Sequence, residues 1–435
     1  MESELVIKGA TIVDFQGSRR SDILIKGSFI VAVEPNIEPS SSARVLDASG
    51  CILTPGLVDL HTHTRQPGNE DAETIASAAR AAALGGYTAI MAMPNTIPAI
   101  DSAPMVKYVL ELSQDVCCEV KVAGAITKGR KGEQLSPMAE MADCGVSLFS
   151  DDGSGVQDDN LMRMAFEYAS SLGVGIAQHC ENLSLSNGGS MNEGEISSLL
   201  GLDGIPSESE ELMIIRDLSL AKLTKARLHL MHLSSAGSVS LVAQAKTQGV
   251  DLTAEVTPHH LSLTEEKVCS FDPIFKVNPP LRTTSDRSGL RLGLASSTID
   301  IVATDHAPHS SEKKELPFDL APPGMLGLQS ALSVVLSDLY AQDSEIKMPL
   351  EAILAAMSWK PAKIGGFTKT QGRPVGVGEI ANLAVIDLSE KWQLDKKLLV
   401  SNSYNTPFLD KPLTGRVRHT IFKGEPVVID AQVCR

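Results

Sequence analysis

The sequence predicts an α/β protein in which a (β/α)8 barrel of the TIM type is joined to a small β-sandwich domain. From about residue 55, apolar strand-like segments alternate with helix-forming segments, as they do in a barrel of repeated strand–helix units. The residues on either side of this region are instead rich in short β segments. No glycine-rich dinucleotide fingerprint follows the first strand of the alternation, which disfavours a doubly wound open sheet.

Eight segments have the apolar, β-rich character of barrel strands, and helix-forming segments separate most of them. The first helical segment is rich in alanine and ends at Gly85-Gly86, a pair that stops helices. The predicted strands are 58–63, 87–93, 120–126, 146–150, 174–179, 227–232, 251–256 and 300–304. The predicted helices are 72–84, 160–172, 208–223, 238–248 and 286–295.

Short β segments at both ends of the chain predict the second domain. They are 5–8, 11–14, 22–26 and 29–33 near the N-terminus, and 381–387, 417–422 and 427–429 near the C-terminus. We expect the two sets to pair, so that residues 1–54 and 370–435 form one β-sandwich. The catalytic barrel, residues 55–369, would then be inserted between its two halves.

Composition limits the classes of partner. The 435-residue chain carries a formal net charge of −15 and has no long basic run, which disfavours nucleic acid and anionic membrane surfaces. No apolar stretch reaches the length of a membrane span, and the first residues lack the features of a secretory signal. The 7 cysteines are scattered without a CxxC pair, as in a reducing compartment, so we expect a cytoplasmic protein.

The end of the first predicted strand carries two histidines, in the segment Asp59-Leu-His61-Thr-His63. Residues i and i+2 of a strand point to the same face, so the two imidazoles lie side by side, with Asp59 one step back on that face. Such a pair is a half-site for a divalent metal, although an isolated His-x-His is as often two ordinary polar residues.

Four other predicted strands also end in polar side chains. In a barrel of this type the active-site groups lie at the C-terminal ends of the strands, so these ends converge. They are Ser150-Asp151-Asp152-Gly153, Gln178-His179-Cys180-Glu181, His229-Leu-Met-His232 and Thr304-Asp305-His306. Imidazole and carboxylate together favour zinc or a similar divalent ion. Asp305 could both contact a metal and act as a base toward a bound water.

These residues resemble the amidohydrolase superfamily, and within it the dihydroorotase family. The resemblance rests on sequence motifs that extend from one end of the barrel to the other. They are Asp59-Leu-His-Thr-His-Thr-Arg-Gln-Pro-Gly68, Met93-Pro-Asn-Thr96, Phe149-Ser-Asp-Asp-Gly153, Asn278-Pro-Pro-Leu-Arg282, Ala303-Thr-Asp-His-Ala-Pro-His309 and Pro323-Gly-Met-Leu-Gly-Leu328.

The resemblance implies a role for each matching residue. Asp305 would be a metal ligand and the general acid/base, and the pyrimidine-ring amide would contact Asn278 and backbone groups of Pro323 and Gly324. The substrate carboxylate would contact Arg65, Asn95 and His309, where a guanidinium fork suits a carboxylate. The implied ligands of one or two zinc ions per subunit are His61, His63, Asp152, His179, His232 and Asp305.

The fourth strand departs from the pattern of many relatives. Hydantoinases, dihydropyrimidinases and allantoinases bridge two metals there with a carboxylated lysine, but this chain has no lysine between Lys131 and Lys222. Asp152 stands in that place, as in the bacterial dihydroorotase type, while Asp151 is expected to face away. Thr64 and Gln66 also differ from the residues common in the family, which predicts tuning of the site without loss of function.

Several other candidate ligands are expected to be structural. We expect Cys180 to pack into the barrel wall, His229 to point away from the metal and His306 to face away from Asp305. His259 and His260, after the seventh strand, are expected to be structural or to support the ligands.

The resemblance implies reversible cyclisation of N-carbamoyl-L-aspartate to L-dihydroorotate in de novo pyrimidine synthesis. It also implies a small-molecule substrate, a homodimer and an assembly with aspartate transcarbamoylase as one option. Two alternatives remain open at this point. One is a hydantoinase or allantoinase, and the other is a catalytically silent, dihydroorotase-like partner of aspartate transcarbamoylase.

Overall fold

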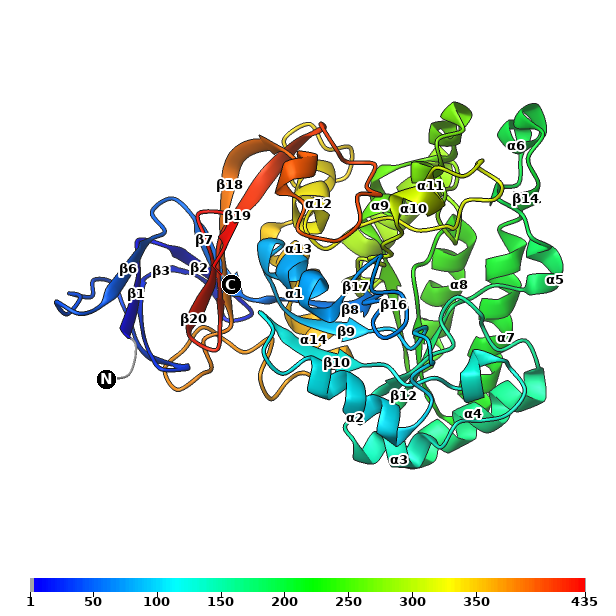
Figure 1. The fold of residues 1–435 in the computed structure, drawn as a ribbon, viewed down its shortest axis with the longest axis horizontal. Coiled ribbons are helices and arrows are strands. Elements are labelled where there is room, and N and C mark those ends of the chain that lie inside the picture. Colours follow the sequence, from blue (N-terminus) through cyan, green and yellow to red (C-terminus); the bar gives the residue numbers. More distant parts are fainter. Residues whose placement is uncertain (1–3, 435) are drawn as a thin grey trace.

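The computed structural model describes residues 4–434 and contains the predicted barrel of parallel strands (Figure 1). Its strands form two hydrogen-bonded groups, β10-β9-β8 and β11-β12-β15-β16-β17. Parallel bridges from Gly124 to Phe149 and from Thr62 to His306 join the groups and close the barrel. The strands are β8 (Leu57–Thr62), β9 (Tyr87–Ala92), β10 (Glu119–Val122), β11 (Leu148–Phe149), β12 (Gly175–Gln178), β15 (Arg227–Leu230), β16 (Leu252–Val256) and β17 (Ile301–Val302).

Most of these strands are shorter than the sequence predicted. The fourth contains only Leu148–Phe149 and the eighth only Ile301–Val302, where we expected 146–150 and 300–304. The chain leaves the strand conformation at the polar residues of the barrel mouth. His232 has a φ of 32° and Asp305 a φ of 44°, both in the left-handed region that a regular strand excludes. The predicted strands therefore included residues that belong to the site.

Helices cover the outside of the barrel and begin where capping residues allow. The first, α1 (Ile75–Leu84), starts three residues later than predicted because Thr74 is its N-cap and accepts a hydrogen bond from the Ser77 amide. The other helices include α2 (Ala103–Leu112), α3 (Met138–Asp143), α4 (Asp159–Leu172), α7 (Glu208–Thr224), α8 (Ala236–Thr247), α9 (Pro258–Ser262), α10 (Thr284–Ala295), α12 (Ala331–Leu339), α13 (Leu350–Met357) and α14 (Trp359–Ile364).

Two excursions were not predicted as separate elements. Between β12 and α7 the chain forms α5 (Leu183–Ser186), β13 (Met191–Asn192), α6 (Glu195–Leu200) and β14 (Gly204–Ile205), at the far end of the barrel from the small domain (Figure 1). After β17 it forms the short helix α11 (Ser311–Lys314). Each of these helices and strands contains 6 residues or fewer, which is too short to show a helical or strand periodicity in the sequence.

The two ends of the chain build the small domain together (Figure 1). One sheet has the order β5-β4-β1-β6 and the other β21-β20-β19-β18-β7-β2-β3. Strand β7 pairs antiparallel with β18, so that Leu53 from one end of the chain faces Val385 from the other. The strands are β1 (Glu4–Lys8), β2 (Thr11–Asp14), β3 (Gly17–Arg20), β4 (Asp22–Lys26), β5 (Phe29–Glu34), β6 (Arg44–Asp47), β7 (Ile52–Pro55), β18 (Leu383–Gln393), β19 (Pro412–Phe422), β20 (Glu425–Ile429) and β21 (Gln432–Val433).

The domain boundaries at 54/55 and 369/370 stay a prediction. The pairing itself does show that segments near both boundaries share one sheet, since Pro55 faces Leu383. Strands β18 and β19 each extend over 11 residues, well beyond the predicted segments. The connection between them leaves the small domain and reaches the barrel.

The apolar interior of the barrel lies below its polar mouth. Buried side chains such as Val58, Met91, Leu148 and Ile301 fill this interior. A larger apolar layer lies between the strands and the surrounding helices. Polar groups at the strand ends therefore sit on a rigid, close-packed base. Among residues 4–434, no helix is long and apolar enough to cross a lipid bilayer.

Gly85 gives a test of this packing. A Cβ atom at this position would lie 2.0 Å from the carbonyl oxygen of Leu328, a backbone atom that cannot move independently. We predict that Gly85→Ala lowers the free energy of unfolding by about 2 kcal/mol, because overpacking forces the backbone to shift. Thermal unfolding followed by circular dichroism measures the change.

Gly376→Ala is the matched control, since a Cβ there meets no atom within 4 Å. It should change the stability by less than about 0.5 kcal/mol. Equal stability of the two variants would contradict the close contact between α1 and the segment that contains Leu328.

Candidate metal centre and substrate pocket

A cavity of about 280 Å³ opens at the mouth of the barrel. Its lining contains every predicted site residue except His61, which is fully buried behind the wall. The lining residues are His63, Arg65, Asn95, Arg130, Asp152, Gly153, His179, His232, Asn278, Asp305, Ala307, His309, Pro323 and Gly324. The structure therefore brings together side chains that lie up to about 260 positions apart in the sequence.

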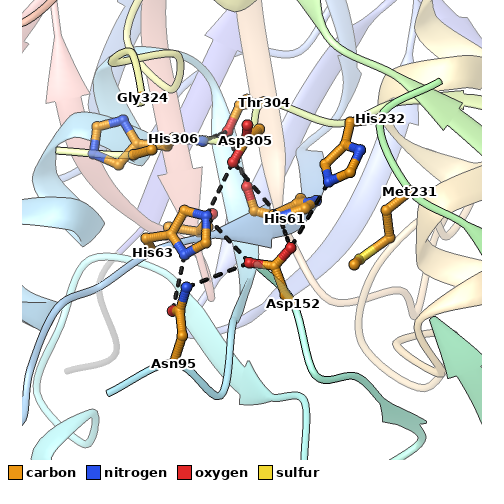
Figure 2. Close-up of polar contacts among 12 residues, drawn as sticks. His61, His63, Asn95, Asp152, Met231, His232, Thr304, Asp305, His306 and Gly324 are labelled. Atoms are coloured by element: carbon orange, nitrogen blue, oxygen red, sulfur yellow. Dashed lines mark hydrogen bonds and ion pairs between the residues drawn. The ribbon is translucent and has the colours of Figure 1, made fainter. Parts of the chain in front are cut away.

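Asp152 is the centre of the polar cluster (Figure 2). Its Oδ1 lies 3.4 Å from His61 Nε2, 3.6 Å from His179 Nδ1 and 3.8 Å from His232 Nε2. Its Oδ2 lies 3.5 Å from His63 Nε2. One carboxylate thus faces nitrogen atoms that come from three strands of the barrel.

Asp305 faces the same histidines from the end of β17. Its Oδ1 lies 3.0 Å from His63 Nε2 and 3.6 Å from His61 Nε2. The left-handed backbone at Asp305 and His232 costs a non-glycine residue on the order of 1–3 kcal/mol. The surrounding contacts must hold both residues in this conformation, which directs the side chains of Asp305 and His232 into the cluster.

Hydrogen bonds fix which ring nitrogen of each histidine carries the proton. His61 Nδ1 lies 2.7 Å from Glu255 Oε1, His63 Nδ1 lies 2.9 Å from Asn95 Oδ1, and His179 Nε2 lies 3.0 Å from Glu181 Oε2. Each of these oxygens accepts, so each of these nitrogens donates. The other nitrogen of each ring then presents a lone pair to the cluster, as a metal ligand must.

The donor set fits a divalent metal. His61 Nε2 is buried and has no hydrogen-bond partner, although it faces the cluster. Ligand atoms of His61, His63 and Asp152 lie within 4.8 Å of one another, and so do those of Asp152, His179 and His232. Imidazole and carboxylate donors in this mixture suit zinc-like ions. Asp152 belongs to both groups, so it is the residue that could bridge two ions.

The charges of the cluster are strongly coupled. Burial alone would raise the pKa of Asp152, but His61, His179 and His232 hold that pKa well below its usual range. Burial likewise opposes ionisation of Asp305, but His61 and His63 outweigh it and lower its pKa. Both carboxylates are therefore ionised at neutral pH and available as ligands or bases.

Arg65 and His309 form the positively polarised wall of the pocket. Arg65 Nε donates to the carbonyl oxygen of Pro308 at 3.0 Å, and burial lowers the pKa of Arg65 to about 10, so it stays charged at neutral pH. Burial and the nearby Arg65 lower the pKa of His309 to about 3. His309 is therefore neutral, and its Nε2 donates to the Pro323 carbonyl oxygen at 2.8 Å.

The predicted ring-binding groups are partly engaged within the protein. Asn278 Nδ2 donates to Glu181 Oε2 at 2.9 Å. The Gly324 amide donates to the carbonyl oxygen of Lys276 at 2.9 Å, so in this conformation it has no hydrogen to offer a ligand. The Pro323 carbonyl already accepts from His309, although its second lone pair is free to accept another bond. The substrate-binding roles of these residues stay predictions.

The residues expected not to be ligands lie outside the cluster. Asp151 accepts hydrogen bonds from the backbone of Ile126 and Thr127 and so faces away. His306 Nε2 contacts Glu73 at 3.2 Å, and His260 contacts Thr257 and Pro279. Asp59 also makes no contact with the cluster, because its carboxylate accepts from the Thr304 amide at 2.7 Å and ties β8 to the end of β17.

Sequence reasoning missed Glu255 and Arg130, and it named Glu181 at the end of the fifth strand without giving it a role. Glu255 joins two histidines, with Oε1 on His61 and Oε2 at 3.0 Å from His229 Nε2. An acid near the end of the largely apolar β16 was a usable signal, since a buried carboxylate requires partners. Arg130, by contrast, lies in the loop after β10, where nothing in the sequence distinguishes it.

Comparison with known proteins finds similar sequences and structures. A family model described as "Dihydro-orotase-like" matches residues 50–238. The chain is 46% identical to the dihydroorotase of a Sulfurihydrogenibium species, over 98% of this chain and 100% of that protein. It is also 46% identical to the dihydroorotase of Streptomyces coelicolor, over 99% of this chain and 100% of that protein. Among solved structures, the L-hydantoinase of Arthrobacter aurescens matches with a TM-score of 0.88 and 25% identity, covering 100% of this chain and 98% of that one.

The barrel and its cluster of histidines and carboxylates define a protein of the amidohydrolase superfamily. Within that superfamily, near-complete coverage at 46% identity is decisive: the chain belongs to the dihydroorotase family.

The contact between Glu255 and His61 can be tested by metal binding. We predict that Glu255→Ala lowers the affinity for zinc about 10- to 100-fold, because His61 loses the acceptor that fixes its ring. Competition with a coloured chelator measures the affinity. Glu255→Gln keeps an acceptor oxygen and should retain more of the zinc affinity than Glu255→Ala does.

Asp251→Ala, at an exposed position just before β16, is the control and should bind zinc as the wild type does. Wild-type affinity in Glu255→Ala would show that His61 needs no support from this carboxylate.

Proposed function

We propose that this chain is a zinc-dependent dihydroorotase. It would interconvert N-carbamoyl-L-aspartate and L-dihydroorotate, the ring-closing reaction of de novo pyrimidine synthesis. The observation that carries the proposal is the position of Asp152 among four histidines, in a cavity that also contains the charged Arg65. The names of the relatives, each a dihydroorotase aligned over nearly its whole length, support it.

The metal would be held by His61, His63, Asp152, His179, His232 and Asp305, with one or two ions per chain. A zinc ion bound there would polarise the carbonyl group under attack and acidify the attacking water. Glu255, Glu181 and Asn95 would keep the three histidines that they contact in the ligating tautomer.

Arg65 would bind and orient the substrate carboxylate. Its guanidinium stays charged and its Nε is fixed on Pro308, so the remaining donors are directed by a rigid side chain. His309 would contribute as a neutral imidazole, without a charge of its own. Asn95, which lines the same cavity, would complete the carboxylate subsite.

Asp305 would move the proton. In hydrolysis its carboxylate accepts a proton from the attacking water and delivers it to the ring nitrogen as the C–N bond breaks. In ring closure it accepts the proton of the carbamoyl nitrogen as the C–N bond forms and returns it to the departing carboxyl oxygen, which leaves as water with a second proton taken up from solution. The lowered pKa of Asp305 keeps it in the basic form in which either sequence starts.

The similarity to hydantoinase structures makes hydantoinase activity the second candidate function. A hydantoinase would open 5-substituted hydantoins, and the family resemblance implies a carboxylated lysine in such enzymes at the place where this chain has Asp152. The charged Arg65 in the cavity favours a substrate that carries its own carboxylate. A silent scaffold is disfavoured because the complete candidate ligand set is present in the cluster.

The remaining expectations belong to the same proposal. They are a homodimer, an assembly with aspartate transcarbamoylase as one option, and a cytoplasmic location.

A cyclisation assay tests the proposal. We expect the zinc-loaded protein to form dihydroorotate from N-carbamoyl-L-aspartate, and Asp305→Asn to lower kcat by about 10³-fold, since the amide cannot accept the proton. The zinc content of both proteins is measured alongside, because Asp305 is also a candidate ligand.

Asp343→Asn, at an exposed loop position, is the control and should be as active as the wild type. Faster turnover of 5-substituted hydantoins than of dihydroorotate would favour the hydantoinase activity instead. Equal rates in wild type and Asp305→Asn would remove the proton-transfer role.

A further inference from the structure

The connection between β18 and β19 brings buried polar side chains to the mouth of the barrel. It begins in the small domain and contains Ser401, Ser403, Asn405 and Thr406, each 6% exposed or less. No part of 401–409 belongs to a helix or strand. Buried polar side chains on an irregular segment require hydrogen-bond partners, so their contacts identify the other segments to which this connection is bonded.

The start of this segment is anchored to the loop before α1. Ser401 Oγ donates to Glu73, and Ser403 Oγ donates to the Ala72 carbonyl oxygen at 2.7 Å. Glu73 is fully buried, and its Oε2 also lies 3.2 Å from His306 Nε2. The segment is therefore fixed to the loop between β8 and α1 and, through Glu73, to His306, the residue that follows Asp305.

Asn405 then joins two separate parts of the pocket rim. Its Oδ1 accepts from the His309 amide at 3.1 Å, and its Nδ2 donates to the carbonyl oxygens of Ala307 at 2.9 Å and Gly324 at 3.0 Å. Its own carbonyl oxygen accepts from the Leu326 amide at 2.9 Å. The side-chain amide thus bonds to residues 307 and 309 after β17 and to residue 324, all of which line the cavity.

These bonds set the position of His309 relative to the loop that it contacts. His309 Nε2 donates to Pro323 and lies 3.4 Å from Arg65 Nη2. A shift of either rim segment would change the distance between His309 and Arg65. Lys314 Nζ also donates to Gly324 at 3.2 Å, whereas the Asn405 side chain bonds to both segments from outside the rim.

We propose that Asn405 is a positioning residue for the carboxylate-binding wall, so that the small domain completes the substrate pocket through its β18–β19 connection. This inference rests on the proposed function, because it assigns the wall formed by Arg65 and His309 to the substrate carboxylate. Asn405 would contact neither the substrate nor the metal. It would act through the backbone of residues 307–309 and 324.

Asn405→Asp is the sharpest variant, because it keeps the shape and the acceptor but replaces both donors with oxygen. The new oxygen would face the carbonyl oxygens of Ala307 and Gly324. We expect the KM for N-carbamoyl-L-aspartate to rise about 10- to 100-fold while kcat changes less than about threefold. Zinc content should be that of the wild type. Asn405→Ala, which adds no charge, should show the same split and serves if the aspartate variant does not fold.

Asn402→Ala is the matched control on the same segment. Its exposed side chain donates to Glu70 and contacts neither rim segment, so its KM and kcat should be those of the wild type. An unchanged KM in both Asn405 variants, or a loss of zinc that parallels the loss of activity, would overturn the positioning role.

Hydrogen–deuterium exchange separates this inference from the proposed function. The amides of His309 and Leu326 should exchange faster in Asn405→Ala than in Asn402→Ala, whatever the substrate is. Equal exchange in the two variants would overturn the inference even if the enzyme is a dihydroorotase. Faster exchange in a protein that does not cyclise N-carbamoyl-L-aspartate would support the contact and reject the proposed function.

Discussion

The buried carboxylate of Asp152 among four imidazoles is the interaction on which the rest of the site depends. A carboxylate that is only 3% exposed is costly unless cations or donors surround it, and the surrounding nitrogens meet that need only from fixed positions. Glu255, Glu181 and Asn95 supply those positions by accepting from the outer ring nitrogens. A metal ion fits this arrangement because the inner nitrogens are left with lone pairs directed at one small volume.

The fold supplies rigidity where the cluster needs it. Each ligand candidate lies at or just beyond a strand end, above an apolar interior that cannot deform cheaply. The wall opposite the cluster is different, because it consists of irregular segments held by side-chain hydrogen bonds. Asn405 and Lys314 hold this wall from outside, so the metal centre depends on the barrel and the substrate wall on longer-range contacts.

The sequence predicted the barrel and the residues that gather at its mouth, because both follow from local patterns. Strand–helix alternation identifies the barrel, and a barrel brings its strand ends to one face. It did not predict the short strands, since the left-handed backbone of His232 and Asp305 has no signature in residue type. It also missed Glu255 and Asn405, whose partners are set by packing between distant segments. The hydrogen bond from the Gly324 amide to the Lys276 carbonyl oxygen could not be predicted for the same reason.

The most direct test of the central claim is the metal content of the wild type and of Asp152→Ala. Both proteins are loaded with zinc, freed of loosely bound metal by gel filtration, and measured by mass spectrometry of the element per chain. We expect the wild type to retain one or two ions and Asp152→Ala to retain at least one fewer per chain, with its fold intact by circular dichroism. The same number of ions in both proteins would contradict the role of Asp152 as the ligand on which the centre is built.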